Sequence, residues 1–156
     1  PLNLYSHYPY RYRPLLVRAM WHLSDIWNPH SYFVIKKILK REKPDIVHTM
    51  NLIGLSTSVF TAIRDSRCPH IHTLTDGALI SPWANLMRNG RMISFNLLDK
   101  LYIKVKRSLV KSPTAVLSLS RFMQNMHLGN GYFKNCPSYI IDYPHRLYSN
   151  STRGKS

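Results

Sequence analysis

Hydrophobic and polar positions along the chain alternate between two patterns. In long stretches, apolar residues recur three or four positions apart, as on one face of an α-helix. This spacing predicts helices over residues 15–27, 30–41, about 55–67, 93–111 and 121–128. Between them lie short apolar runs with β-branched residues, a pattern typical of buried strands. These runs predict strands over residues 46–49, 70–74, 115–119 and 138–141.

The order of the predicted elements indicates an α/β fold. Short apolar strands that alternate with helices are typical of a mainly parallel sheet covered by helices on both faces. One domain over residues 15–147 would hold all of these elements. Residues 1–14, rich in Tyr, Arg and Pro, predict an irregular start. The polar residues 148–156 predict a disordered tail.

The charge balance narrows the choice of partners. The 156 residues include 22 Lys and Arg against 7 Asp and Glu, which gives a net charge of +15. Such an excess attracts polyanions, whether nucleic acid, acidic lipid headgroups or phosphorylated substrates. No apolar run of bilayer-spanning length and no secretory signal is visible. Cys68 and Cys136 lie far apart, and a reduced cytosolic pair is a simpler interpretation than a disulfide.

Polar residues gather where three of the predicted strands end. The clusters are HTMN at residues 48–51, TLTD at 73–76 and SLSR at 118–121. The carboxyl ends of parallel strands lie at one edge of the sheet, where ligands bind in folds of this kind. We therefore expect one binding site at this edge. Cys68, His70 and His72 lack an evident fourth ligand, so no metal site is expected.

Three segments, in a fixed order, carry a further signal. They are KPDIVH (residues 43–48), PHIHTLTD (69–76) and AVLSLSRF (115–122). Shorter matches follow them, at Asn51 and residues 54–56, at residues 81–82, and at residues 131–133. In order, spacing and composition, over roughly residues 20–144, this set resembles the N-terminal domain of family 4 glycosyltransferases.

The resemblance implies a two-domain enzyme of the GT-B type. Its N-terminal domain would be a Rossmann-like, three-layer α/β domain that faces the acceptor. A second domain would hold a nucleotide sugar as co-substrate, and the sugar would be transferred with retention at the anomeric carbon, without a cofactor or an essential metal. The implied acceptor is a glycan or lipid-linked sugar in bacterial surface polysaccharide synthesis, either lipopolysaccharide O-antigen or capsule. The implied location is cytoplasmic, peripheral on the inner face of the plasma membrane.

Residue type and this resemblance together select candidate site residues. Asp76 is the catalytic candidate, because a carboxylate can accept two hydrogen bonds from sugar hydroxyls. Capping of its own turn is the alternative. The substrate-binding candidates are His48, Asn51, Gly54, Thr75, Ser120 and Arg121. Ser120 could present its hydroxyl to a phosphate or serve as a helix N-cap, and a structural role is the alternative for His48, Asn51 and Gly54.

The sequence also departs from the family pattern. Thr75 stands where the family commonly has a histidine, and a threonine cannot titrate near neutral pH. Glu42 is the only glutamate, so the pair of glutamates that the family places near the donor is absent. The usual first strand and glycine-rich loop are absent as well. We therefore expect half of an enzyme, which needs a donor domain in cis or in trans and does not transfer sugar alone.

The predicted helix over residues 93–111 allows two interpretations. Its basic residues fall on one stripe, at Lys100, Lys104, Arg107 and Lys111. Apolar residues lie roughly opposite, at Leu98, Leu101, Val105 and Leu109. The helix could dock on an anionic membrane, with about 1 kcal/mol contributed per basic residue. Alternatively, it has a solvated basic face above a buried apolar one.

Two other functions stay open on the sequence. A basic nucleic-acid-binding module would fit the charge and the abundant Tyr. However, the basic residues are spread through the chain and no recognised binding motif is present, so no specific nucleic acid is expected as a partner. The other alternative is a non-catalytic remnant that binds a partner protein.

Overall fold

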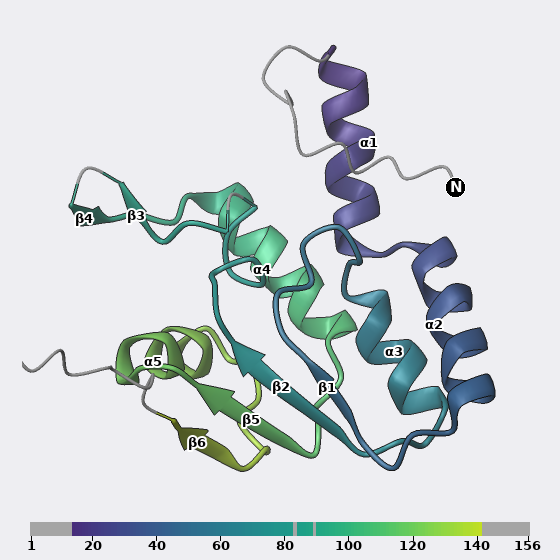
Figure 1. Cartoon of the computed structure of the whole chain (residues 1–156). Coiled ribbons are helices and arrows are strands. Elements are labelled where there is room, and N and C mark those ends of the chain that lie inside the picture. Colours follow the sequence, from purple (N-terminus) through teal and green to yellow (C-terminus); the bar gives the residue numbers. More distant parts are fainter. Residues whose placement is uncertain (1–13, 83, 89, 142–156) are drawn as a thin grey trace, which may run out of the picture.

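The computed structural model describes residues 14–82, 84–88 and 90–141 (Figure 1). Its helices are α1 (Leu15–Ile26), α2 (Pro29–Glu42), α3 (Ser58–Asp65), α4 (Leu97–Leu109) and α5 (Arg121–Gly129). Its strands are β1 (Val47–Thr49), β2 (His70–Leu74), β3 (Met87–Arg88), β4 (Arg91–Met92), β5 (Ala115–Ser118) and β6 (Ser138–Ile140). The predicted irregular start, apart from Pro14, lies outside the described residues, and so do residues 142–147 and the predicted tail.

The central sheet consists of four parallel strands in the order β1-β2-β5-β6. Each step to the next strand passes through α3, α4 or α5, because parallel neighbours need a crossover connection. The register pairs Val47 with His70 at the start of β1, and Leu74 with Ser118 at the end of β2. The prediction of fold class is confirmed: the chain forms an α/β, Rossmann-like domain with a parallel sheet.

The core lies in two clusters of buried apolar side chains. The larger cluster consists of Phe60, Leu74, Leu79, Ile80, Leu86, Ile103, Val116, Tyr132 and Phe133. The smaller one joins α2 to α3 and consists of Leu39, Val59 and Ile63. Burial of one such side chain contributes about 1.5–3 kcal/mol. Because the larger cluster includes residues 79, 80 and 86, it also fixes the segment that follows β2.

The starts of the helices follow their capping residues. Asn28 accepts a hydrogen bond from the Ser31 backbone N–H and precedes a proline at the first position of α2. α4 begins at Leu97 instead of residue 93, because Asn96 and Asp99 form a capping box there. The short strands β3 and β4, which the sequence pattern does not predict, pair antiparallel.

The buried face of α4 differs from the one that the apolar spacing suggests. Leu98 and Leu101 are 74% and 56% exposed. The buried residues of the helix are Tyr102, Ile103 and Lys106. This inward face is partly polar: Tyr102 and Lys106 both bond to the buried carboxylate of Asp25 in α1. The basic stripe is exposed to solvent and the helix has a buried face, as one interpretation expects, but that face is not the predicted apolar stripe. Of that stripe, Leu98, Leu101 and Val105 are exposed and Leu109 is half-buried.

Candidate functional site

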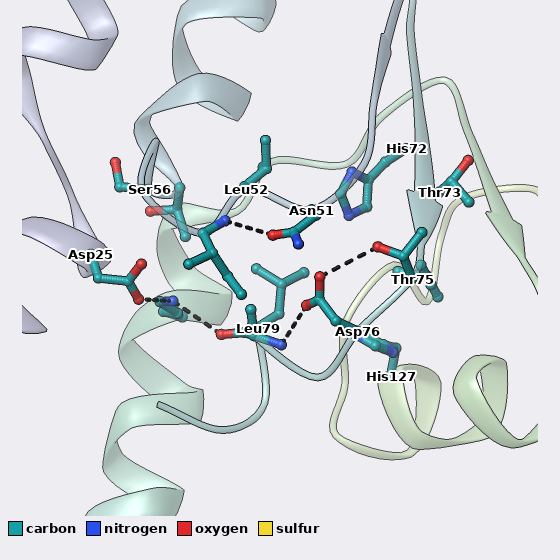
Figure 2. Close-up of a pocket in the computed structure, with 15 residues that line it drawn as sticks. Asp25, Asn51, Leu52, Ser56, His72, Thr73, Thr75, Asp76, Leu79 and His127 are labelled. Carbon is teal, nitrogen blue, oxygen red and sulfur yellow. Dashed lines mark hydrogen bonds and ion pairs between the residues drawn. The ribbon is translucent and has the colours of Figure 1, made fainter. Parts of the chain in front are cut away.

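A narrow pocket opens where β1 and β2 end, between the loops that follow them and the helices α4 and α5 (Figure 2). Its polar lining residues are Asp25, Asn51, Ser56, Thr57, His72, Thr73, Thr75, Asp76, Lys106 and His127. The free space inside has a volume of about 20 Å³, which is room for one water molecule or one hydroxyl group. The pocket therefore lies at the sheet edge that the strand order predicts for a binding site.

The structure brings three of the predicted site residues together in this pocket. Asn51, Thr75 and Asp76 all contribute to its lining. The other four candidates are not among the lining residues: His48, Gly54, Ser120 and Arg121. The pocket thus contains candidates from the loops after β1 and β2, but it includes neither His48 and Gly54 nor the candidates at the end of β5.

Three of the four other candidates have structural roles. His48 Nε2 lies 2.7 Å from Thr73 Oγ1. Ser120 caps α5, because its Oγ accepts a hydrogen bond from the Met123 backbone N–H at 3.2 Å. Gly54 has a φ of 90°, which side chains rarely allow, so it serves the turn after β1. These contacts match the structural alternatives, and a substrate role for these residues stays a prediction.

Asp76 is held in place by its own loop. Its Oδ1 accepts a hydrogen bond from the Ala78 backbone N–H at 2.7 Å, and its Oδ2 accepts one from Thr75 Oγ1 at 3.3 Å. It therefore caps its own turn, as the structural alternative proposed, while it also lines the pocket. A carboxylate has about four lone-pair positions, so Asp76 keeps acceptor capacity for a ligand.

Asn51 is fixed in a similar way in the loop after β1. Its Oδ1 accepts a hydrogen bond from the Ile53 backbone N–H at 3.0 Å. The side-chain NH₂ group is left as a donor, and the residue lines the pocket. The pocket therefore combines a donor from the loop after β1 with an acceptor from the loop after β2.

A buried ion pair forms one side of the pocket. Lys106 Nζ donates to Asp25 Oδ2 at 2.6 Å and to the Ala78 carbonyl oxygen at 3.1 Å. The Tyr102 hydroxyl donates to the same Asp25 oxygen at 3.2 Å. Burial lowers the pKa of the Lys106 ammonium, and the Asp25 carboxylate opposes this shift. The pair joins the end of α1 to α4 and to the loop that carries Asp76. The sequence gives no sign of it, because its partners are 81 positions apart.

His127 of α5 lies on the other side of the pocket from Asp25 (Figure 2). The side chain is 1% exposed, and its ring contacts the ring of Tyr132 edge to face. Nδ1 lies 2.9 Å from the Met123 carbonyl oxygen, so this nitrogen carries the proton and donates it. Burial lowers the pKa of the ring, which is therefore neutral at pH 7 with an unprotonated Nε2. Sequence reasoning missed this residue, since a lone histidine within a helix gives no functional signal.

Two buried histidines of β2 bond to β1, and one of them, His72, also lines the pocket. The Thr49 hydroxyl lies 2.7 Å from His70 Nε2 and 2.8 Å from His72 Nδ1. The ring of Phe60 packs against both imidazoles. Burial lowers the pKa of His70 to about 4 and that of His72 to about 3, so both rings are neutral at pH 7. The described part of the chain contains no group of three His, Cys, Asp or Glu side chains placed to hold a metal ion.

Comparison with known proteins identifies the family of this chain. The model of the family described as Glycosyltransferase Family 4 matches residues 3–141. The chain belongs to glycosyltransferase family 4. This family 4 chain is 32% identical over 140 residues to an "Uncharacterized 42.6 kDa protein in cps region" of Klebsiella pneumoniae. The match covers 89% of the chain and 38% of that relative, so the chain spans well under half of the relative's length. No solved structure shows a significant match to it.

The departure of this family 4 chain at Thr75 has a structural consequence. The hydroxyl of Thr75, at the position where the resemblance predicts a histidine, donates to Asp76. The residue therefore supports the carboxylate and adds no titratable group to the pocket. Within the described residues, the histidines that line the pocket are His72, in the middle of β2, and His127, on α5.

Proposed function

We propose that this family 4 chain is the acceptor-side domain of a retaining glycosyltransferase. The complete enzyme transfers a sugar from a nucleotide sugar to a glycan or lipid-linked acceptor. The product is a bacterial surface polysaccharide, either capsule or lipopolysaccharide O-antigen. The observation that carries this proposal is a carboxylate-containing pocket at the carboxyl edge of a parallel sheet in a family 4 chain. The relative in a cps region, a name that denotes capsular polysaccharide synthesis, favours a polysaccharide product.

The pocket offers groups that suit the hydroxyl of an acceptor sugar. A hydroxyl both donates and accepts, so it can donate to Asp76 and accept from the NH₂ group of Asn51. The free volume of about 20 Å³ admits a hydroxyl but not a sugar ring. In this proposal the ring of the acceptor lies at the mouth of the pocket, where a second domain presents the donor.

The donor is bound by a second domain, in the same polypeptide or on a partner. The match to the Klebsiella pneumoniae protein covers 38% of that relative, so most of the relative lies beyond the matched segment. The single glutamate of this chain, Glu42, forms an exposed ion pair with Arg41 at the end of α2, at 2.6 Å. It does not line the pocket. A pair of donor-side glutamates must therefore come from outside this chain.

The proposal includes a peripheral position on the inner face of the plasma membrane, with α4 as the docking element. Lys100, Lys104, Arg107 and Lys111 are exposed. Leu98 and Leu101 of the same helix are exposed as well. A helix that exposes both basic and apolar side chains suits the interface of an anionic bilayer. A lipid-linked acceptor would then reach the pocket from the membrane surface.

The helix α1 carries further exposed apolar side chains. Leu16, Met20 and Leu23 are 72%, 50% and 67% exposed, and the helix extends beyond the body of the fold in Figure 1. The Asp25–Lys106 bond ties the C-terminal end of α1 to α4. In the described ranges, no helix has the length and apolar character needed to cross a membrane.

A chimera tests the proposed function. The matching segment of the Klebsiella pneumoniae relative is replaced by this chain, and sugar transfer from UDP-glucose, UDP-galactose and GDP-mannose to a bacterial membrane fraction is measured. We expect transfer by the chimera and none by the 156-residue chain alone. Transfer by the isolated chain would contradict the proposal, and so would an inactive, folded chimera beside an active parent protein.

A further inference from the structure

His127 presents an unused hydrogen-bond acceptor to the pocket. Its Nδ1 is taken by the Met123 carbonyl oxygen at 2.9 Å. Over residues 14–82, 84–88 and 90–141, no group forms a hydrogen bond with its Nε2. The ring lines the pocket, and no bond within these residues uses the lone pair of Nε2. A neutral imidazole with this tautomer accepts a proton donor at Nε2 and cannot donate from it.

Asp76 is a second acceptor beside this ring. Both side chains line the same pocket, and Figure 2 draws them next to each other, on the side opposite Asp25. The carboxylate of Asp76 acts on the imidazole, where it opposes the effect of burial on the pKa of His127. The two acceptors differ in depth, because His127 is 1% exposed while Asp76 is only partly buried.

Both acceptors are held rigidly by bonds that leave their remaining lone pairs free. The Ala78 backbone N–H and the Thr75 hydroxyl hold the Asp76 carboxylate, and the Met123 carbonyl oxygen holds the imidazole. Acceptors fixed in this way bind a ligand with little loss of side-chain entropy. Their natural ligand is a pair of hydroxyl groups, since each hydroxyl carries one proton to donate.

We propose that His127 and Asp76 bind two neighbouring hydroxyls, a vicinal diol, of the acceptor sugar. One hydroxyl enters the pocket, where the free volume of about 20 Å³ fits it, and donates to His127 Nε2. The neighbouring hydroxyl stays at the mouth and donates to Asp76. This inference rests on the proposed acceptor-side function, and it adds a specificity-determining residue on α5 that the sequence motifs do not select.

Nuclear magnetic resonance of the histidine rings tests the diol site directly. The probes are the methyl glycosides of glucose, galactose and mannose, added to ¹⁵N-labelled chain. We expect free His127 to show a protonated Nδ1 and an unprotonated Nε2, as its bond to Met123 requires. A bound sugar should then shift the Nε2 signal upfield and leave the Nδ1 signal nearly unchanged, a response that a purely structural histidine would not give.

The second measurement is the sugar affinity of two matched variants. His127→Phe keeps a ring of similar shape and removes the acceptor. It should weaken sugar binding about three- to tenfold, the effect of one lost hydrogen bond. His30→Phe, on the exposed N-terminal part of α2, is the control and should leave binding unchanged.

The outcomes separate this inference from the function on which it rests. If sugar shifts the signals of Asn51 and Asp76 but leaves Nε2 unmoved, and if His127→Phe binds equally well, the diol site is wrong and the acceptor-side function stands. If no sugar binds the wild-type pocket, both are overturned. If the His127→Phe variant does not fold, the sugar-induced shift of the Nε2 signal in the wild-type chain is the only test of the diol site. A shift then supports the diol site, and no shift overturns it.

Discussion

Acid should destabilise this domain because the fold keeps two buried histidines, His70 and His72, in their neutral form. The Thr49 hydroxyl has a single proton, so it donates to one of the rings of His70 and His72 and accepts from the other. Protonation of the ring that accepts would remove its bond to Thr49 and leave a charge against the ring of Phe60. The neutral form of each ring is thus favoured by the fold.

The pH window follows from the pKa values. In the unfolded chain both rings titrate near pH 6.5, whereas in the folded domain the pKa is about 4 for His70 and about 3 for His72. The unfolded state therefore binds more protons below pH 6.5, so stability is full above that pH and falls as the pH drops toward the folded-state values. At pH 5 the loss is roughly 2 kcal/mol per ring, a large share of the about 5–15 kcal/mol that stabilises a domain.

Urea unfolding followed by circular dichroism at pH 7.5 and pH 5 measures this loss. His72→Gln, which retains polar groups near Thr49 but cannot become charged, should show a smaller pH dependence than the wild type by roughly 2 kcal/mol. The same carboxylates titrate in both proteins, so their contributions cancel in this comparison. His30→Gln, at an exposed position, is the control. Equal pH dependence in His72→Gln and the wild type would refute the assignment of the acid loss to this ring.

Three further predictions concern the ion pair, the sheet and α4. Lys106→Met should destabilise the domain by about 3–5 kcal/mol in urea unfolding, because it leaves Asp25 buried without its partner, and Asp25→Asn in the same chain should restore part of this loss. Ser118→Ala should be neutral or stabilising by up to about 1 kcal/mol, since Ser118 Oγ is buried and has no hydrogen-bond partner within the described residues; a loss above that size would show a hidden partner. Changing Lys100 and Lys104 to Gln should weaken sedimentation with anionic phosphatidylserine vesicles by about 1 kcal/mol each, and not with neutral vesicles, whereas unchanged binding would remove α4 as the docking element.

The sheet could be predicted from sequence because its signals are local. Each strand of the central sheet is a short run with β-branched residues, and the runs alternate with helical spacing, which defines the crossovers. The polar clusters at the ends of β1 and β2 were expected at one edge of the sheet, and Asn51 and Asp76 do line one pocket there. The loop residues Thr75 and Asp76 needed no long-range information, since they bond within their own turn.

The parts that the sequence could not predict depend on contacts far apart in the chain. Spacing alone shows a basic and an apolar stripe on α4 but not that a third face, with Tyr102 and Lys106, is the buried one. The burial of this face depends on Asp25 of α1, which bonds to Lys106. A lysine in a helix is normally exposed, so only the position of its partner reveals its burial. His127 enters the site for a similar reason, because the packing of α5 on β5 and β6 brings it to the pocket.

The rate of sugar transfer by the chimera with Asp76→Asn tests the central claim most directly. Asparagine keeps an oxygen that can accept from the Ala78 backbone N–H, so the turn persists while the charge is lost. Asp45→Asn, at an exposed position before β1, is the matched control. We predict that transfer by the Asp76→Asn chimera falls roughly 10- to 100-fold, the effect of one lost hydrogen bond to a charged group, and that the control keeps its rate. An unchanged rate in a folded Asp76→Asn chimera would contradict the assignment of this pocket to the acceptor.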